Sequence, residues 1–131
     1  LLKLKINDMA TLTPTVTLSG TAADFGNALS LSSSDTLTVS EPTQGLSRID
    51  VLHTGSGTEI ITAAASNPHT YFYAKNTDAT NYVICRNAAG EEWGRLAPGE
   101  FMFMAVAATV GIEFLAVTAT CIVEYGYWSK T

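Results

Sequence analysis

The side chains best suited to general-base chemistry are two histidines, His53 and His69. A hydrolytic triad joins such a base to a nucleophile and to an acid that orients it. Neither histidine lies in a nucleophile motif, and His53 falls in a predicted strand on the face opposite to that of Leu52. The sequence therefore predicts ordinary surface or interface histidines, no catalytic residue, and a protein that is not an enzyme.

Acidic and glycine-rich segments are the next places where an ion or a phosphate could bind. Glu91 and Glu92 are adjacent, and neighbours in a strand point to opposite faces, so they do not make a two-carboxylate site. Gly55-Ser56-Gly57 is not followed by a helix, whose N-terminus a phosphate loop uses. We predict turns at both places, and neither a metal nor a cofactor.

Aromatic side chains are the largest group of candidate binding residues: Tyr71, Tyr73, Tyr82, Trp93, Tyr125, Tyr127 and Trp128. Exposed flat rings could stack on the apolar faces of sugars. The competing interpretation places them in the core or in a subunit interface, where tyrosine and tryptophan contribute large contact areas. We favour the core or an interface and keep sugar binding as the alternative.

Composition limits the partners that these residues could have. The net charge of −5, with scattered basic residues, argues against nucleic acid. No run of about 18 apolar residues is present, so no membrane span is expected. Apolar residues nevertheless make up 47% of the chain. Because soluble monomers keep their exposed apolar patches small, this excess indicates a surface that is buried in an oligomer or a larger assembly.

The two cysteines, Cys85 and Cys121, both fall in predicted strands. Two cysteines in a chain of 131 residues are no disulfide framework. We expect two buried thiols, with a disulfide between them as the alternative.

Short strands separated by turn residues follow one another through the C-terminal half. The expected strands are 70–75, 81–86, 92–96, 101–106, 112–117 and 121–127. We expect a meander in which 70–75 pairs with 81–86, and 112–117 with 121–127, as hairpins. Ala97-Pro98-Gly99-Glu100 has the proline and glycine of a type II turn. Segment 101–106 is apolar on both faces, which predicts that it is covered on both sides.

The first half of the chain is richer in serine, threonine and glycine. Residues 1–6 alternate apolar and basic side chains, which predicts a terminal strand that pairs with its own sheet or with a neighbour's. Residues 29–31 and 37–39 are expected to form a hairpin around a turn at 32–35. No window has helical spacing.

About ten to twelve short strands at regular spacing predict an all-β chain. The expected fold is an antiparallel β-sandwich, with a jelly roll as one form of it and a closed barrel as the less favoured architecture. The predicted organisation is an N-terminal strand or arm over residues 1–14 and a single sandwich domain over residues 15–131.

Three short motifs resemble those of small β-sandwich virion proteins of tailed bacteriophages. They are Lys75-Asn76-Thr77 after an aromatic strand, then Leu96-Ala97-Pro98-Gly99-Glu100-Phe101, then Val123-Glu124-Tyr125 in a last strand. In that group a strand ending in Asn-Thr, a Leu-x-Pro-Gly-Glu turn and a terminal Val-Glu-Tyr strand occur in the same order. The resemblance covers roughly the C-terminal half, and its motifs mostly encode turns.

This resemblance implies a non-enzymatic structural protein of a phage virion, assembled in the host cytoplasm. Capsid decoration (cement) proteins of that group are commonly trimers on the shell. The implied partners are therefore further copies in a homotrimer and the major capsid protein or other virion proteins, with no nucleic acid and no membrane. A tail or fibre component and a carbohydrate-binding adhesin remain alternatives. The residues expected at interfaces are Leu2, Leu4, Ile6, Met102, Met104, Tyr127 and Trp128.

Overall fold

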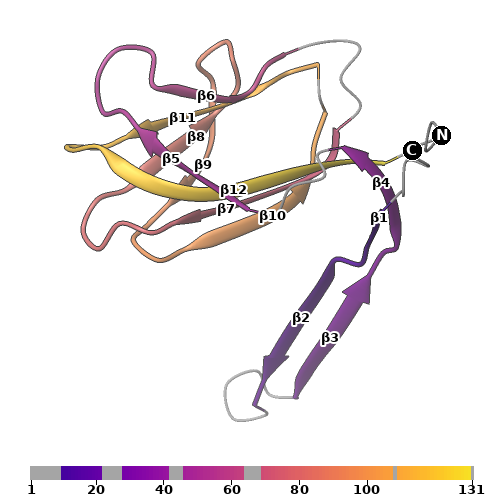
Figure 1. Cartoon of the computed structure of the whole chain (residues 1–131). Helices are drawn as coiled ribbons and strands as arrows, with labels where there is room; N and C mark the ends of the chain where they lie inside the picture. Colours follow the sequence, from indigo (N-terminus) through magenta and orange to yellow (C-terminus); the bar gives the residue numbers. More distant parts are fainter. Residues whose placement is uncertain (1–9, 22–27, 42–45, 64–68, 108, 131) are drawn as a thin grey trace, which may run out of the picture. The chain divides into compact units, whose positions relative to one another are not determined.

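Figure 1 shows the computed structural model of the chain, which describes residues 10–21, 28–41, 46–63, 69–107 and 109–130. Within these ranges there are strands but no helix, so none is present that could cross a membrane. The strands are β1 (Ala10–Leu12), β2 (Thr15–Gly20), β3 (Leu29–Ser34), β4 (Leu37–Glu41), β5 (Ser47–Val51), β6 (Thr58–Ile61), β7 (His69–Asn76), β8 (Val83–Arg86), β9 (Glu92–Leu96), β10 (Phe101–Ala105), β11 (Ile112–Ala116) and β12 (Cys121–Lys130). The all-β prediction is confirmed. The strand predicted over residues 1–6 lies outside the described residues.

The chain divides into two compact units, Leu1–Ser40 with Thr131, and Glu41–Lys130. In the first unit, β1 pairs with β4 and β2 pairs with β3, all antiparallel. Between these two ladders the backbone N–H of Asp35 donates to the carbonyl of Pro14 at 3.1 Å. The strands therefore make one continuous two-stranded ladder, called here the ribbon.

The hairpin expected around residues 32–35 is wrong. Serine favours turns because its hydroxyl competes for nearby backbone groups. Residues 32–34 instead continue β3, whose partner is β2 rather than β4. Their serine hydroxyls lie at exposed positions, opposite Thr15, Val16 and Thr17 of β2. The predicted domain boundary at residue 14 stays a prediction. In the structure, the antiparallel pairing continues directly beyond it, with Thr15 opposite Ser34.

The second unit contains two antiparallel sheets packed together. One sheet has the order β5-β12-β7-β10, and the other is four-stranded with the order β6-β11-β8-β9. This is the strand order of a double-sheet jelly roll. The sandwich prediction is confirmed. Figure 1 shows the two sheets facing each other.

The expected meander is wrong in its pairing. β7 and β8 are consecutive but belong to different sheets, and so do β11 and β12. Among the described strands of this unit, only β8 and β9 are both consecutive and paired. Turn residues specify that the chain reverses; they do not specify whether the next strand joins the same sheet or crosses the core to the other. Both solutions bury one face of each strand.

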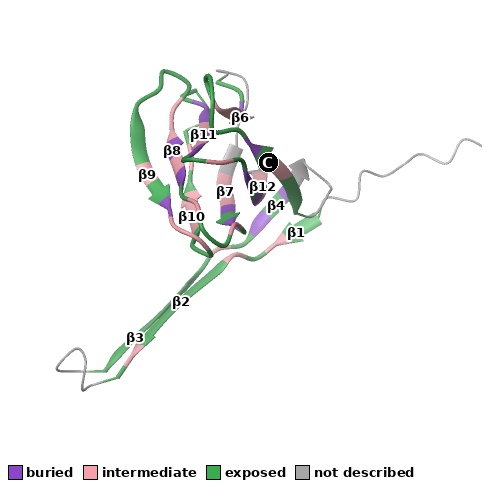
Figure 2. Ribbon diagram, turned by 90° about the vertical axis from the view of Figure 1, so that its left-hand side faces the viewer, coloured by how far each residue is buried: buried purple, intermediate pink, exposed green. Residues whose placement is uncertain are grey.

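The core of the sandwich is drawn from both sheets. Its buried residues are Val51, Ile61, Phe72, Ala74, Val83, Cys85, Leu96, Ile112, Phe114, Ala116, Cys121 and Val123. Phe72 of β7 and Phe114 of β11 meet edge to face, with ring centroids 5.8 Å apart. In Figure 2 the buried residues of these strands alternate with more exposed ones, as expected when one face of each strand is covered.

Candidate functional site

The face of the β5-β12-β7-β10 sheet that is turned away from the core is aromatic. Cross-strand partners share a face of a sheet. Tyr73 lies opposite Phe103 in β10, and Tyr71 lies opposite Trp128 in β12. Their strand neighbours Phe72 and Ala74 are fully buried on the other face. Outward positions of a sandwich are usually polar, so this arrangement is unusual for a surface that only meets water.

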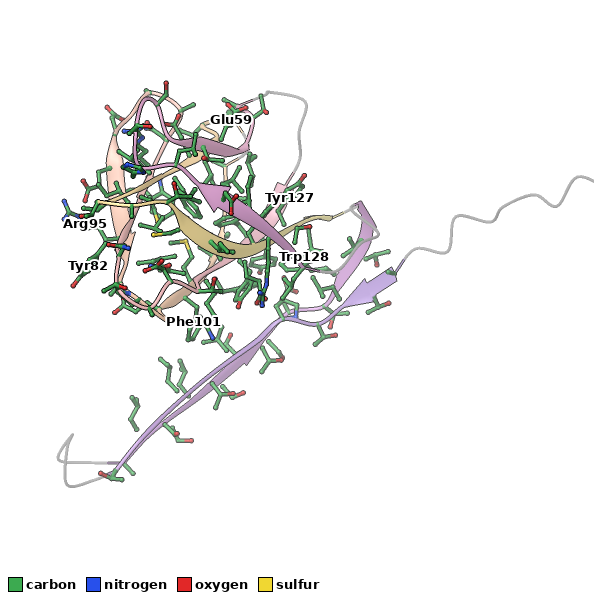
Figure 3. All side chains as sticks on the ribbon, turned by 60° about the vertical axis from the view of Figure 1, so that its left-hand side comes forward. Glu59, Tyr82, Arg95, Phe101, Tyr127 and Trp128 are labelled. Carbon is green, nitrogen blue, oxygen red and sulfur yellow. The ribbon has the colours of Figure 1, made fainter. Side chains whose placement is uncertain are left out.

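Two of these outward rings pack against each other. Tyr71 and Phe103 are stacked, with centroids 5.1 Å apart and planes inclined by 20°. A Cβ added at Gly126 would lie 2.9 Å from the Trp128 ring, so the glycine leaves room for the indole to lie over β12. Phe101 is 69% exposed, and Figure 3 labels it together with Trp128. Tyr71, Tyr73, Phe101, Phe103 and Trp128 are called here the aromatic face.

A row of charges borders the aromatic face. Lys75 lies opposite Phe101 on one side and Glu124 on the other, and Glu124 lies opposite Arg48. The Glu124 carboxylate is 3.7 Å from the Arg48 guanidinium and accepts a hydrogen bond from the Tyr73 hydroxyl at 3.3 Å. Burial, and then the charge of Glu124, raise the pKa of Tyr73, so this hydroxyl stays a proton donor.

Two grooves open at the edge strands β9 and β10, and Trp93 lines both. One has a volume of about 340 Å³ and is lined by Met104, Val106 and Ile112 among others. The other, of about 500 Å³, includes Met102, Phe101 and the charged residues Arg95 and Glu100. Met102 and Met104 lie on the core-facing side of β10, opposite the buried Ala74 and Phe72. On the other side of β10, the described residues leave Phe101 69% exposed.

The residues predicted to lie at interfaces do not form one surface. Met102 and Met104 line the two grooves, and Tyr127 packs partly buried against the core. Trp128 belongs to the aromatic face, opposite Tyr71. The remaining predicted residues, Leu2, Leu4 and Ile6, lie outside the described part of the chain. Their roles at interfaces stay predictions.

The three motifs of the phage resemblance meet at one end of the sandwich, around Asn76. This residue is fully buried, and its side-chain amide donates to the carbonyls of Asn81 at 2.8 Å and Leu96 at 3.1 Å. Its side-chain oxygen accepts the N–H of Asp78 at 3.0 Å. Because every polar atom of the Asn76 side chain is used, the residue is a structural link between turns rather than a free binding group.

Backbone bonds complete this link. The N–H of Gly99 donates to the Asn76 carbonyl at 2.9 Å, and the Asn76 N–H donates to the Glu100 carbonyl at 3.0 Å. The hydroxyl of Thr77 donates to the carbonyl of Ile122, next to the Val-Glu-Tyr motif, at 2.6 Å. Gly99 has a φ of 79°, as the predicted type II turn requires.

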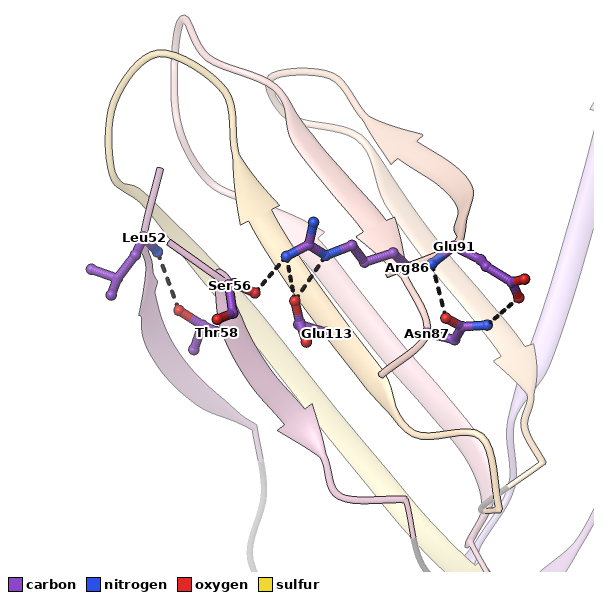
Figure 4. Close-up of polar contacts among 7 residues, drawn as sticks. All are labelled: Leu52, Ser56, Thr58, Arg86, Asn87, Glu91 and Glu113. Carbon is purple, nitrogen blue, oxygen red and sulfur yellow. Dashed lines mark hydrogen bonds and ion pairs between the residues drawn. The ribbon is translucent and has the colours of Figure 1, made fainter. Parts of the chain in front are cut away.

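The glycine loop and the carboxylate pair both have structural roles. The Arg86 guanidinium donates to the carbonyl of Ser56 and pairs with Glu113 (Figure 4). At Gly57, which has a φ of 78°, an added Cβ would lie 2.3 Å from the Phe114 carbonyl oxygen. The loop is therefore a tight turn held against β11.

Glu91 and Glu92 serve separate contacts. Glu91 accepts a hydrogen bond from the Asn87 side-chain amide at 2.8 Å, within the turn between β8 and β9. Glu92 instead pairs with Arg95, whose hydrogen bond and charge lower the pKa of this carboxyl. The described residues contain no group of three potential metal ligands.

The histidines and cysteines are dispersed. His53 was predicted to lie in a strand over 46–54, but β5 ends at Val51. The residue is exposed in the bend that follows, with Nδ1 3.5 Å from the Thr120 hydroxyl. His69 begins β7. Cys85 and Cys121 are free, buried thiols in β8 and β12. Burial, and then Glu92, raise the pKa of Cys85 to about 12, so the thiol is neutral and poorly nucleophilic near pH 7.

No protein-family model, curated protein or solved structure matches this chain. The arrangement of its side chains therefore carries the functional argument. Sequence reasoning selected Tyr71, Tyr73 and Trp128 but missed that Phe101 and Phe103 join these three on one face. The other four candidate rings, Tyr82, Trp93, Tyr125 and Tyr127, lie outside that face. Both segments, 71–75 and 101–105, carry aromatic residues at alternate positions. The sequence did not show that these two strands pair, or in which register.

Proposed function

We propose that this chain is a non-enzymatic structural protein of a tailed-phage particle. In this role it decorates the capsid and stabilises the shell through contacts with further copies and with the major capsid protein. The observation that carries the proposal is the aromatic face. Clustered rings on an outward sheet face contribute large contact area at low entropic cost, which favours a protein interface over a solvent-exposed surface.

The fold and the motifs also support this proposal. Jelly rolls are frequent in viral capsid domains, although fold alone does not assign a function. The Asn-Thr, Leu-x-Pro-Gly-Glu and Val-Glu-Tyr motifs share one hydrogen-bonded end of the sandwich, so the resemblance involves residues that act together rather than scattered turns.

A homotrimer is the assembly that the resemblance implies, and it forms part of the proposal. Multi-angle light scattering of the purified chain measures its mass directly. We expect trimers, or pairs of trimers, that dissociate into smaller species when Phe101→Ser removes the most exposed ring of the aromatic face. Leu52→Ser is the matched control, because Leu52 is also exposed, at 47%, but lies outside that face. A wild-type monomer, or equal loss in both variants, contradicts the assigned surface.

Localisation on the particle tests the function itself. Purified virions of the phage that encodes the chain are labelled with an antibody against it and imaged by electron microscopy. We expect label over the head. Label confined to the tail assigns the chain to the tail or fibre alternative. Particles that lack the chain altogether overturn the proposal.

A carbohydrate-binding module is the second candidate, favoured by Trp93. Its ring is 42% exposed beside two grooves that also present Asn87, Arg95 and Glu100, which combines a stacking surface with polar groups. Saturable binding on a glycan array that is lost in Trp93→Ala and retained in Tyr82→Ala would establish this function. Absence of any saturable glycan signal for the wild-type chain removes it.

A further inference from the structure

The β2–β3 part of the ribbon has one apolar and one hydroxyl face. Leu18 lies opposite Leu31, Val16 opposite Ser33, and Leu29 opposite Gly20. The alternate positions carry only hydroxyls: Thr15, Thr17, Ser19, Ser30, Ser32 and Ser34. In Figure 3, carbon-only side chains project from one side of this ribbon and oxygen-tipped ones from the other.

The apolar face is open to solvent in the structure. Val16, Leu18, Leu29 and Leu31 are 41%, 51%, 41% and 46% exposed. Figure 2 shows exposed residues along both strands. An isolated two-stranded ribbon is marginally stable at best in water, and a further apolar layer is the usual remedy. This segment therefore needs a cover for its Leu and Val side chains.

The shape of the face fits a second copy of itself. On the apolar face, the central cross-strand pair is Leu18 with Leu31. The pairs on either side of it, Val16 with Ser33 and Leu29 with Gly20, each join one large side chain to one small residue. When two such faces are related by a two-fold axis between them, Val16 meets Gly20 or Ser33 of the other copy, and Leu29 meets Ser33 or Gly20. Large side chains then face small ones, as close packing requires.

The charge of the face also fits a second copy. No Asp, Glu, Lys or Arg is present in described residues 10–21 and 28–34. The chain as a whole carries a net charge of −5, so most contacts between copies would bring like charges together. Two copies could meet through the apolar face of β2 and β3 without that repulsion and without burying an unpaired charge.

We propose that the apolar faces of two ribbons, each formed by Val16, Leu18, Leu29 and Leu31, pack against each other and join two copies of this chain. The contact deepens the proposed function, because it supplies a specific surface for self-assembly. It requires no phage partner, so purified protein tests it separately. If the aromatic face also closes trimers, ribbon pairs join them two by two, and even-numbered species result.

Disulfide crosslinking tests the contact and its direction. Leu18→Cys and Leu31→Cys are oxidised separately and as an equal mixture, then run on non-reducing gels. An antiparallel pair places Leu18 over Leu18 and crosslinks each variant alone, whereas a parallel pair crosslinks the mixture. Thr17→Cys, on the hydroxyl face, is the matched control and should stay uncrosslinked. Wild-type Cys85 and Cys121 are buried and should give no product.

A charge variant gives a second, independent measurement. Leu31→Asp should weaken self-association, measured by sedimentation equilibrium, by at least about tenfold, because it buries an unpaired carboxylate in the contact. Ser32→Asp adds the same charge to the opposite face and should change the dissociation constant by less than about twofold. Circular dichroism confirms that both variants keep the β-sandwich.

Each other outcome overturns the proposal. If no crosslink forms in either variant or in their mixture and the new thiol resists maleimide, the chain's own residues cover the face. If the thiol reacts freely, the face has no partner in solution. Equal effects of Leu31→Asp and Ser32→Asp would likewise show that the apolar face is not the contact. The particle-labelling result is unaffected in all three cases, so the proposed function stands or falls separately.

Discussion

The sandwich and the β2–β3 part of the ribbon are both built from antiparallel strands, yet their apolar side chains differ in burial. In the sandwich, inward side chains of two sheets bury one another, with Phe72 and Phe114 in contact across the core. In the ribbon, the apolar side chains of β2 and β3 share one face and remain about half exposed. Alternation of apolar and polar residues therefore predicts which face of a strand is apolar. It does not predict what buries that face.

Polar groups differ in the same way between the two regions. The sandwich fixes its turns with a buried amide, Asn76, whose side-chain atoms are all hydrogen-bonded. The β2–β3 strands present rows of threonine and serine hydroxyls at exposed positions. The sandwich is thus specified by interactions within the chain, whereas β2 and β3 leave their apolar face open to solvent in the structure.

The largest expected effect is on the sandwich core. Phe72→Ala removes a fully buried ring and should lower the free energy of unfolding by about 3–5 kcal/mol. Leu18→Ala on the ribbon should change it by less than about 0.5 kcal/mol when the protein is dilute enough to be monomeric. Urea denaturation followed by tryptophan fluorescence measures both. Similar losses in the two variants would end the distinction between the regions.

Asn76→Ala should be the next most damaging change. It leaves the buried carbonyls of Asn81 and Leu96 without their donor, at a cost of about 2–3 kcal/mol in the free energy of unfolding. Thr17→Ala removes a hydroxyl from the ribbon and should cost less than about 0.5 kcal/mol. Thermal unfolding by calorimetry compares them. A stable Asn76→Ala protein would mean that the turns hold together without this amide.

Alkaline pH should weaken the sandwich through Cys85. In the unfolded chain this thiol ionises near its ordinary pKa of about 8.5, whereas burial raises the pKa of folded Cys85 to about 12. Between these values the unfolded chain releases a proton that the folded chain keeps, so stability falls as pH rises. Cys85→Ala should flatten this part of the curve of unfolding free energy against pH. Parallel curves for the two proteins would contradict the burial of the thiol.

A small effect on stability is expected from shortening the ribbon. Pro14 and Asp35 are joined by a backbone hydrogen bond, so residues 15–34 can be replaced by an Asn-Gly turn. The free energy of unfolding should change by less than about 1 kcal/mol, because no residue of the sandwich core is removed. Self-association through the ribbon should be lost, as sedimentation measures. A large loss of stability would show that the sandwich depends on these strands.

The sequence predicted the strand content better than the pairing. Turn residues such as Pro98-Gly99 and the alternation of β11 marked where strands end and which residues face inward, because these signals are local. Whether β7 pairs with β8 or β10 depends on contacts between segments far apart in the chain, and no local signal records it. The aromatic face was hidden for this reason: Phe103 and Tyr71 belong together only after β7 and β10 are paired.

The ribbon was misassigned for a related reason. Ser32, Ser33 and Ser34 have the composition of a turn, but a serine at an exposed strand position costs little when its partner strand lies alongside. A run of hydroxyl residues at alternate positions, matched by another such run, is the pattern that would have revealed the two-stranded ladder.

The place of β12 in its sheet has a consequence for how the molecule is made. β12 lies between β5 and β7 and pairs with both, yet it is the last strand of the sandwich to be synthesised. Until it emerges from the ribosome, the nascent chain holds two unpaired edges with apolar faces. Folding must wait for this strand, and chaperone engagement or premature aggregation is concentrated in that interval.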